Sequence, residues 1–207
     1  QAPAAPAAAP AQPAATAANA PKPDVPLDEL LKAGPLPDNF MGDAKAPVTI
    51  VEYASMSCPH CADFHENVFP AFKAKYIDTG KVRFIFREYP LNDPAVVVAM
   101  LARCTGPVRF FPFVAAMFGS QDQWLVDDGS IDQKILQMAK QAGFTDESFQ
   151  ACTHDQKLLT AITQQRDAAE KNFAVHGTPT FFVNGVMMKG DHQMADFEKA
   201  LAPFLKG

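Results

Sequence analysis

Two cysteines separated by two residues are the side chains in this sequence best suited to chemistry, Cys58 and Cys61 in the motif Cys58-Pro59-His60-Cys61. An apolar, β-branched run precedes the motif and an amphipathic pattern follows it. This predicts a buried strand, a short loop and a helix that starts at Cys58, with Pro59 in its first turn. The unpaired N–H groups and the dipole of that helix place partial positive charge beside Cys58. We therefore expect Cys58 to be an acidic, attacking thiol and Cys61 to form a disulfide with it.

Two other uses of this cysteine pair have to be weighed. It could be half of a zinc site, completed by His65 or by the distant Cys104 and Cys152. Such sites usually bring a second closely spaced pair of ligands, and the sequence has none. A purely structural disulfide is the other alternative, but a bridge closing so short a loop restrains little chain. The predicted strand and helix favour redox chemistry, and no metal or cofactor is expected.

Composition and charge limit the remaining function classes. The chain has 207 residues, of which 48% are hydrophobic and 20% charged, enough for one sizeable core. Its net charge of −5 argues against nucleic acid or an anionic membrane as the main partner. The start at Gln1 within Ala/Pro-rich sequence resembles a mature terminus left by signal-peptide cleavage, an expectation that the full gene product would test.

Residues 1–26 are unusual in composition, with 12 Ala and 7 Pro. Recurrent proline prevents a helix, and there is little apolar surface to bury, so we expect a mobile, partly polyproline-like tether. Residues 27–32 could form a short helix or arm, and the folded domain is expected to begin near Phe40.

A strand–helix–strand unit surrounds the motif. Residues 48–53 read as the first strand, and the helix from Pro59 is predicted to run to about Ile77 with a kink at Pro70. Lys81 to Tyr89 alternates as a second strand. A connection of this size predicts a right-handed βαβ unit with parallel strands, and a C-x-x-C at its helix start is the thioredoxin-like arrangement.

Glu52 is a carboxylate within the otherwise apolar first strand, six residues before Cys58. A buried carboxylate needs a partner or takes up a proton, and Arg83 or Arg87 on the next strand could be that partner. Glu52 could then relay protons to Cys61 when the disulfide opens. The alternative is a strand residue that faces solvent.

The segment from Asp93 to about Val175 has an almost wholly helical pattern, which suggests an inserted helical subdomain. Its apolar stripes favour core packing over a binding groove. Ser130 and Thr145 suit N-cap positions. The predicted helices are 94–104, 110–118, 130–141, 146–152 and 155–173.

Cys104 and Cys152 fall in this helical segment, 48 positions apart. In an oxidising compartment they could form a structural disulfide, worth about 4 kcal/mol from the loop entropy that it removes. Two free buried thiols are the alternative.

The chain returns to β sequence after His176. Asn184-Gly185 between two apolar runs predicts a hairpin with a type I′ turn. Pro179 suits a cis bond after Thr178, and in a redox site that loop would lie over the disulfide and bind extended substrate. An ordinary trans proline entering an edge strand is the alternative. Residues 193–205 are predicted to form a closing helix.

Together, the segment from Glu52 to Cys61 and the later Gly177-Thr178-Pro179-Thr180-Phe181 resemble the DsbA family of envelope thiol-disulfide oxidoreductases, over about residues 40–207. The resemblance implies an α/β thioredoxin fold with an inserted α-helical subdomain. Its parts would be a disordered tether and arm (1–39), the first part of the thioredoxin fold (40–92), the helical insertion (93–175) and the second part (176–207).

The same resemblance implies a function and partners. The Cys58–Cys61 disulfide would be donated to reduced, unfolded secreted proteins in the periplasm, and a quinone-linked membrane oxidase of the DsbB type would reoxidise the protein. A cis Thr178-Pro179 bond is also implied, and His60 would help to hold the Cys58 thiolate.

Two features depart from the most familiar members of that family. Thr178 before the proline resembles the disulfide-isomerase branch, and the Cys104/Cys152 pair is an addition. Isomerases of that kind carry an N-terminal dimerisation domain, which residues 1–39 are too short to provide. A monomeric oxidase is therefore favoured, with an isomerase, a reductase or a redox-linked chaperone as alternatives.

Overall fold

The computed structural model of the protein describes residues 20–32 and 34–205. Most of the tether expected over residues 1–26 therefore lies outside the described residues. Among the residues that are described, no helix combines the length and the apolar character needed to cross a membrane.

A five-stranded mixed sheet lies at the centre, in the order β1-β3-β2-β4-β5. The central strands β2 and β3 are parallel, which confirms the predicted βαβ unit, and the other pairings are antiparallel. All seven residues of β2 are buried, as expected for a central strand covered on both faces. The strands are β1 (Asn39–Met41), β2 (Val48–Ala54), β3 (Val82–Glu88), β4 (Thr180–Val183) and β5 (Val186–Met187).

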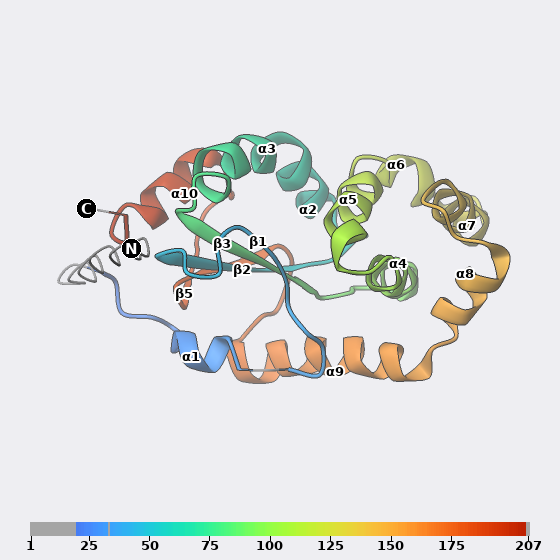
Figure 1. Ribbon diagram of the computed structural model, residues 1–207, viewed down its shortest axis with the longest axis horizontal. Coiled ribbons are helices and arrows are strands. Elements are labelled where there is room, and N and C mark those ends of the chain that lie inside the picture. Colours follow the sequence, from blue (N-terminus) through green and yellow to red (C-terminus); the bar gives the residue numbers. More distant parts are fainter. Residues whose placement is uncertain (1–19, 33, 206–207) are drawn as a thin grey trace, which may run out of the picture.

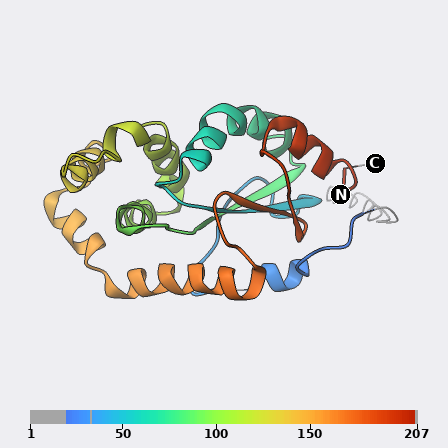
Figure 2. The same ribbon diagram turned by 180° about the vertical axis from the view of Figure 1, so that it is seen from behind.

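Helices cover both faces of the sheet and one end of it (Figure 1). Figure 2 shows the same arrangement from behind, with α2, α3 and α10 above the sheet, α9 and α1 below it, and α4–α8 beyond one end. The α-helices are α1 (Leu27–Leu30), α2 (Pro59–Asp63), α3 (Phe69–Phe72), α4 (Asp93–Cys104), α5 (Pro107–Phe118), α6 (Gln121–Trp124), α7 (Ile131–Gln141), α8 (Asp146–Thr153), α9 (Gln156–Phe173) and α10 (Met194–Leu201).

The helical run after the motif ends at Ile77, as predicted, but it is not a uniform α-helix. Two π-helical turns, Phe64–Val68 and Lys73–Ile77, alternate with α2 and α3. The first of them ends just before Pro70, whose missing N–H cannot complete the α-helical ladder. The predicted irregularity is thus a pair of wider turns flanking the proline.

Strand register decides which side chains share a face. Glu52 pairs with Phe86 and Tyr53 pairs with Arg87 across the parallel β2–β3 ladder. Because side chains alternate along a strand, Glu52 and Phe86 point toward α2 and the helical segment, while Tyr53 and Arg87 point toward α9. The two resulting apolar cores lie on opposite faces of the sheet.

The N-terminal arm is more ordered than expected. The N–H of Val25 donates to the Gly185 carbonyl at 3.0 Å, and the N–H of Met187 donates to Asp24 at 2.7 Å. Val25 and Leu30 are buried against the sheet. The expected tether over 1–26 and disordered region over 1–39 are therefore wrong for the part from Asp24 onward, because a few apolar side chains suffice to dock it.

Strand β1 was not expected, since its three residues fall within a turn-rich stretch. The Asn184-Gly185 hairpin is confirmed, with positive φ angles of 47° and 84°. Gly185 is required there, because a Cβ atom would lie 2.1 Å from the Val25 carbonyl oxygen.

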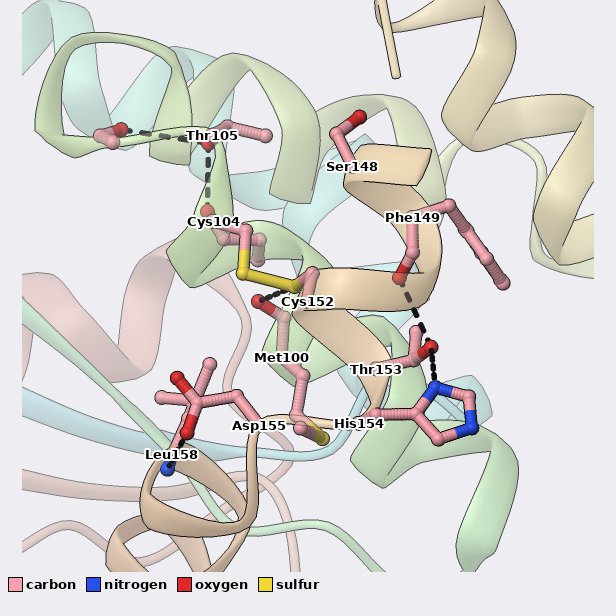
Figure 3. Close-up of a disulfide and its surroundings, with 12 residues drawn as sticks. Met100, Cys104, Thr105, Ser148, Phe149, Cys152, Thr153, His154, Asp155 and Leu158 are labelled. Carbon is pink, nitrogen blue, oxygen red and sulfur yellow. Dashed lines mark hydrogen bonds between the residues drawn. A yellow bond between two sulfur atoms is a disulfide. The ribbon is translucent and has the colours of Figure 1, made fainter. Parts of the chain in front are cut away.

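The segment between β3 and β4 is helical, as predicted. It also contains a short helix, α6, that was not predicted. A disulfide joins Cys104 of α4 to Cys152 of α8, with an S–S distance of 2.06 Å (Figure 3). Thr145 caps α8 through a reciprocal pair of hydrogen bonds with Ser148. Ser130 precedes α7 but does not cap it, because its hydroxyl bonds Asp128 instead.

Candidate active site

Cys58 stands at the N-cap of α2, immediately before Pro59, as the sequence predicts. The position follows from the ends of β2 and α2: the strand stops at Ala54, and the Cys58 N–H donates to the Ser55 carbonyl at 3.0 Å in the connecting turn. Cys58 and Cys61 are both thiols, and both are buried. The helix start thus holds a dithiol beneath the protein surface.

The environment of Cys58 favours the thiolate. Its pKa is lowered from the ordinary value of 9.0 to about 5, first by a hydrogen bond from Cys61, then by the Thr178 side chain and by the backbone N–H groups of Cys61 and His60. Burial acts in the opposite direction but is outweighed. Cys58 is therefore ionised at neutral pH and is the sulfur equipped to attack or to leave.

The environment of Cys61 has the opposite effect. Burial raises its pKa well above 9.0, and the hydrogen bond to Cys58 and the negative charges of Glu52 and Cys58 raise it further. A proton on Cys61 is what allows its thiol to donate to the Cys58 anion. The two sulfurs therefore hold distinct protonation states, one a thiolate and the other a thiol.

The loop before β4 reaches the same place from the far end of the sequence. The Thr178-Pro179 peptide is cis, and Sγ of Cys58 lies 3.2 Å from the Thr178 carbonyl oxygen, which can accept a hydrogen bond from Cys58 only when that thiol is protonated. The Thr178 hydroxyl is buried and has no hydrogen-bond partner among the described residues. It is available to the thiolate, in keeping with its lowering effect on the Cys58 pKa.

A polar hollow of about 420 Å³ adjoins the dithiol. His60 and Asp63 line it from α2, Thr178 and Pro179 from the proline loop, and residues 190–193 from the segment before α10. His60 is exposed, and its imidazole forms no hydrogen bond with Cys58 within the described part of the chain. Its backbone N–H acts on the thiolate, and the expected contribution of its side chain stays a prediction.

Glu52 is fully buried, but its partner is not the expected arginine. Its Oε2 lies 2.8 Å from Nε2 of His65. Arg83 and Arg87 cannot reach it, because their odd positions in β3 point to the other face of the sheet, where Arg87 binds Asp38. Glu52 is close enough to raise the Cys61 pKa, so it belongs to the site.

Two residues of the site were not assigned to it from the sequence. His65, considered only as a zinc ligand, lies four positions after Cys61, a spacing that could have placed it on the same helix face. Gln121 of α6 donates its amide to the carbonyls of Met56 and Cys58 at 2.7 and 3.1 Å. No local pattern marks Gln121, because its role depends on where the helical segment docks.

The residues proposed to complete a zinc site with Cys58 and Cys61 have other partners in the structure. Cys104 and Cys152 are bonded to each other, and His65 is engaged by Glu52. The geometry is that of a redox dithiol at the start of a crossover helix, opposite a cis-proline loop.

Comparisons with known proteins agree with this fold. A family model described as thioredoxin matches residues 36–202. The crystal structure of alpha-DsbA1 from Wolbachia pipientis is 35% identical, with a TM-score of 0.77, and the match covers 86% of this chain and 94% of that one. BdbD from Bacillus subtilis, at 23% identity, has a TM-score of 0.72 over 82% of this chain and 94% of its own, a likeness of fold.

A curated relative from Rickettsia bellii named "Putative protein-disulfide oxidoreductase" is 33% identical over 150 residues, which are 72% of this chain and 58% of the relative. The chain spans 55–60% of the length of this and two other Rickettsia relatives. The thioredoxin fold with a dithiol at its helix start places the chain in the thioredoxin-like class of proteins. Within that class, the chain belongs to the DsbA family.

Proposed function

We propose that the protein is a dithiol oxidase, which donates a Cys58–Cys61 disulfide to reduced secreted proteins in the cell envelope. The observation that carries the proposal is the opposite displacement of the two thiol pKa values, to about 5 for Cys58 and well above 9.0 for Cys61. A stabilised Cys58 thiolate lowers the free energy of the dithiol form. The corresponding disulfide is therefore a strong oxidant.

The reaction consists of two exchanges. A substrate thiolate attacks Sγ of Cys58 in the disulfide form, the Cys58–Cys61 bond breaks, and Cys61 leaves with the bonding electron pair and takes up a proton. A second substrate thiolate then attacks the substrate sulfur of the mixed disulfide. The substrate disulfide forms, and Cys58 leaves as a thiolate, an exit that its low pKa favours. Two electrons have passed from substrate to protein.

Substrate docking fits the polar hollow beside the dithiol. An extended peptide lying along Thr178 and Pro179 would bring its cysteine to Cys58, since the Thr178 carbonyl lies 3.2 Å from that sulfur. The envelope location, the monomeric state and reoxidation by a quinone-linked membrane oxidase of the DsbB type are parts of the same proposal.

The equilibrium constant of the Cys58–Cys61 pair with glutathione tests the direction of electron flow. A reduction potential near that of the envelope oxidants, about −120 mV, is expected for a disulfide donor. A value near about −270 mV, typical of a cytosolic reductant, would reject the oxidase in favour of a reductase. Refolding of a scrambled-disulfide substrate by the reduced protein would favour the isomerase alternative.

A further inference from the structure

The turn between β2 and α2 is fixed by the strand beside it. The carbonyl of Ala54, the last residue of β2, accepts a hydrogen bond from the N–H of Tyr89 at 2.7 Å. One residue further on, Oγ of Ser55 accepts from the N–H of Leu91 at 3.2 Å. Tyr89 and Leu91 both follow β3, the parallel neighbour of β2. The start of the active-site turn is therefore anchored to the segment that leaves β3.

The Ser55 side chain is 0% exposed, and the other groups around it belong to the same turn. The N–H of Ser57 lies 3.4 Å from Oγ of Ser55, and the two hydroxyl oxygens are 3.1 Å apart. The Ser55 carbonyl accepts the N–H of Cys58. A hydroxyl buried this deeply keeps its partners, because an unpaired polar group in the interior is costly. Ser55 thus joins the neighbouring strand, the turn and the dithiol.

The backbone of Ser55 also acts on the second sulfur. Burial raises the pKa of Cys61, and the bond to Cys58 and the charge of Glu52 raise it further, whereas a hydrogen bond from the Ser55 backbone lowers it. Among backbone groups only an N–H can stabilise a sulfur anion, so the Ser55 N–H faces Sγ of Cys61. This N–H favours negative charge on a sulfur whose other surroundings oppose it.

Cys61 carries that negative charge during thiol exchange. When an external thiolate attacks Sγ of Cys58, the Cys58–Cys61 bond breaks and Cys61 keeps the electron pair. Cys61 is 0% exposed, so water does not reach the new anion. A fixed N–H donor supplies the stabilisation that water would give, and it needs no rearrangement at the moment of reaction. The same donor serves Cys61 in the reverse step, when its thiolate attacks a mixed disulfide at Cys58.

We propose that Ser55 is a positioning residue of the exchange reaction: its buried hydroxyl holds the turn so that its own backbone N–H stabilises the anion of Cys61. The inference rests on the proposed thiol exchange and holds for either direction of electron flow. It predicts that loss of the hydroxyl impairs Cys61 as a leaving group while the Cys58 thiolate is unaffected.

One substitution tests this prediction directly. Ser55→Ala removes the hydroxyl that accepts the Leu91 N–H, and Thr105→Val, the control, removes another buried hydroxyl at the end of α4. The rate of reduction of the disulfide by dithiothreitol is measured at neutral pH, and thiolate absorbance of the reduced protein gives the Cys58 pKa. We expect Ser55→Ala to slow the reduction about tenfold, because a displaced donor stabilises the leaving sulfur less.

The Cys58 pKa separates this role from a general loosening of the turn. It should stay at about 5 in Ser55→Ala, because the groups that lower it lie on α2 and the proline loop. Thr105→Val should match the parent in both measurements, and thermal unfolding checks that both variants are folded. A Ser55→Ala rate within about twofold of the parent would overturn the proposal. A slower rate accompanied by a rise of about one unit in the Cys58 pKa would do the same, because the whole turn would then have relaxed.

A second measurement leaves Ser55 in place. In reduced Cys58→Ser, Cys61 is the one remaining thiol, because Cys104 and Cys152 are bonded to each other. Its ionisation is followed by absorbance while NMR records the amide proton of Ser55. The Ser55 resonance should move in step with the ionisation of Cys61. A resonance that stays fixed while Cys61 ionises would contradict the assigned contact.

Failure of this inference and failure of the oxidase proposal are distinguishable. A reducing potential of the parent protein against glutathione would reject the oxidase and leave the Ser55→Ala comparison intact. An oxidising potential together with an unaltered Ser55→Ala rate would reject the role of Ser55 alone.

Discussion

The two cysteine pairs of the protein contrast in position, state and surroundings. Cys58 and Cys61 are thiols at the start of one helix, and the pKa of Cys58 is lowered while that of Cys61 is raised. Cys104 and Cys152 are 48 residues apart, and their disulfide ties α4 to α8 (Figure 3). The first pair closes too short a loop to stabilise the fold, whereas the second closes a long one. Reactivity comes from the helix start and the cis-proline loop rather than from cysteine itself.

Of the substitutions considered, replacement of the attacking sulfur of Cys58 is expected to have the largest effect on activity. We expect Cys58→Ser to lower the rate of dithiol oxidation by a factor on the order of 10³ or more, because Cys61 is buried and stays protonated. Cys61→Ala should instead accumulate mixed disulfides with substrate, visible on non-reducing gels. The matched control, Cys104→Ala with Cys152→Ala, should keep the rate within about threefold of the parent. Equal losses in both pairs would contradict the assignment of separate roles.

The same double variant should show its effect in stability. Loss of the Cys104–Cys152 bridge is expected to lower the free energy of unfolding by up to about 4 kcal/mol, the loop-entropy value for its 48-residue separation. Urea denaturation of the oxidised protein at fixed pH measures this difference. An unchanged midpoint and slope would mean that the bridge does not restrain the unfolded chain.

The Cys58 thiolate should make the stability of the reduced protein depend on pH. The unfolded chain keeps the Cys58 proton up to about pH 9, while the folded protein loses it above about pH 5. Stability therefore rises with pH across this window and is lost as pH falls through about 5. At pH 7, two units above the folded pKa, the gain is about 2.7 kcal/mol relative to pH 4. Urea denaturation at both pH values measures it, and reduced Cys58→Ser should lack the gain.

A smaller effect is expected from the proline loop. Thr178→Val removes the buried hydroxyl that helps to lower the Cys58 pKa, while keeping the shape of the side chain. The Cys58 pKa should rise by about one unit, the equivalent of one hydrogen bond to a charged group. Ultraviolet titration of the thiolate measures it. A pKa that does not move would assign the stabilisation to Cys61 and the helix start alone.

The smallest predicted effect concerns the contact between the helical segment and the active-site loop. Gln121→Met removes the hydrogen bonds to the carbonyls of Met56 and Cys58 and keeps a similar volume. We expect a stability loss of about 1 kcal/mol and a rate loss of a few-fold, because the carbonyls lose a donor but the turn remains. Thermal unfolding and dithiol oxidation measure the two effects. A Gln123→Met control, on the same short helix, should change neither.

Local patterns in the sequence were enough to predict the main elements of the sheet and the helices. The run before Cys58, the helix after it and the Asn184-Gly185 turn each carry their own periodicity or turn chemistry. Strand β1 and helix α6 are too short to show a pattern. The docking of Val25 onto the hairpin depends on a glycine 160 positions later, which composition could not reveal.

The site was only partly predictable, for a related reason. Residue type and spacing were enough to identify Cys58, Cys61 and Pro179 as site residues. The structure brings the dithiol and the proline loop together. The partner of Glu52 was mistaken because strand register, rather than proximity in sequence, decides which side chains share a face. The spacing of His65 from Cys61 indicates a shared helix face, but no local pattern pairs its imidazole with Glu52 of the neighbouring strand.

The central claim is that the fold makes one sulfur far more acidic than the other, and the thiolate absorbance of the reduced protein measures this directly. Titration of the parent protein should show one ionisation centred at about 5 and none other from a thiol below pH 9. The Cys58→Ser variant should lack the first ionisation. A single transition near pH 9 in the parent, or a low-pH transition that survives in Cys58→Ser, would contradict the account.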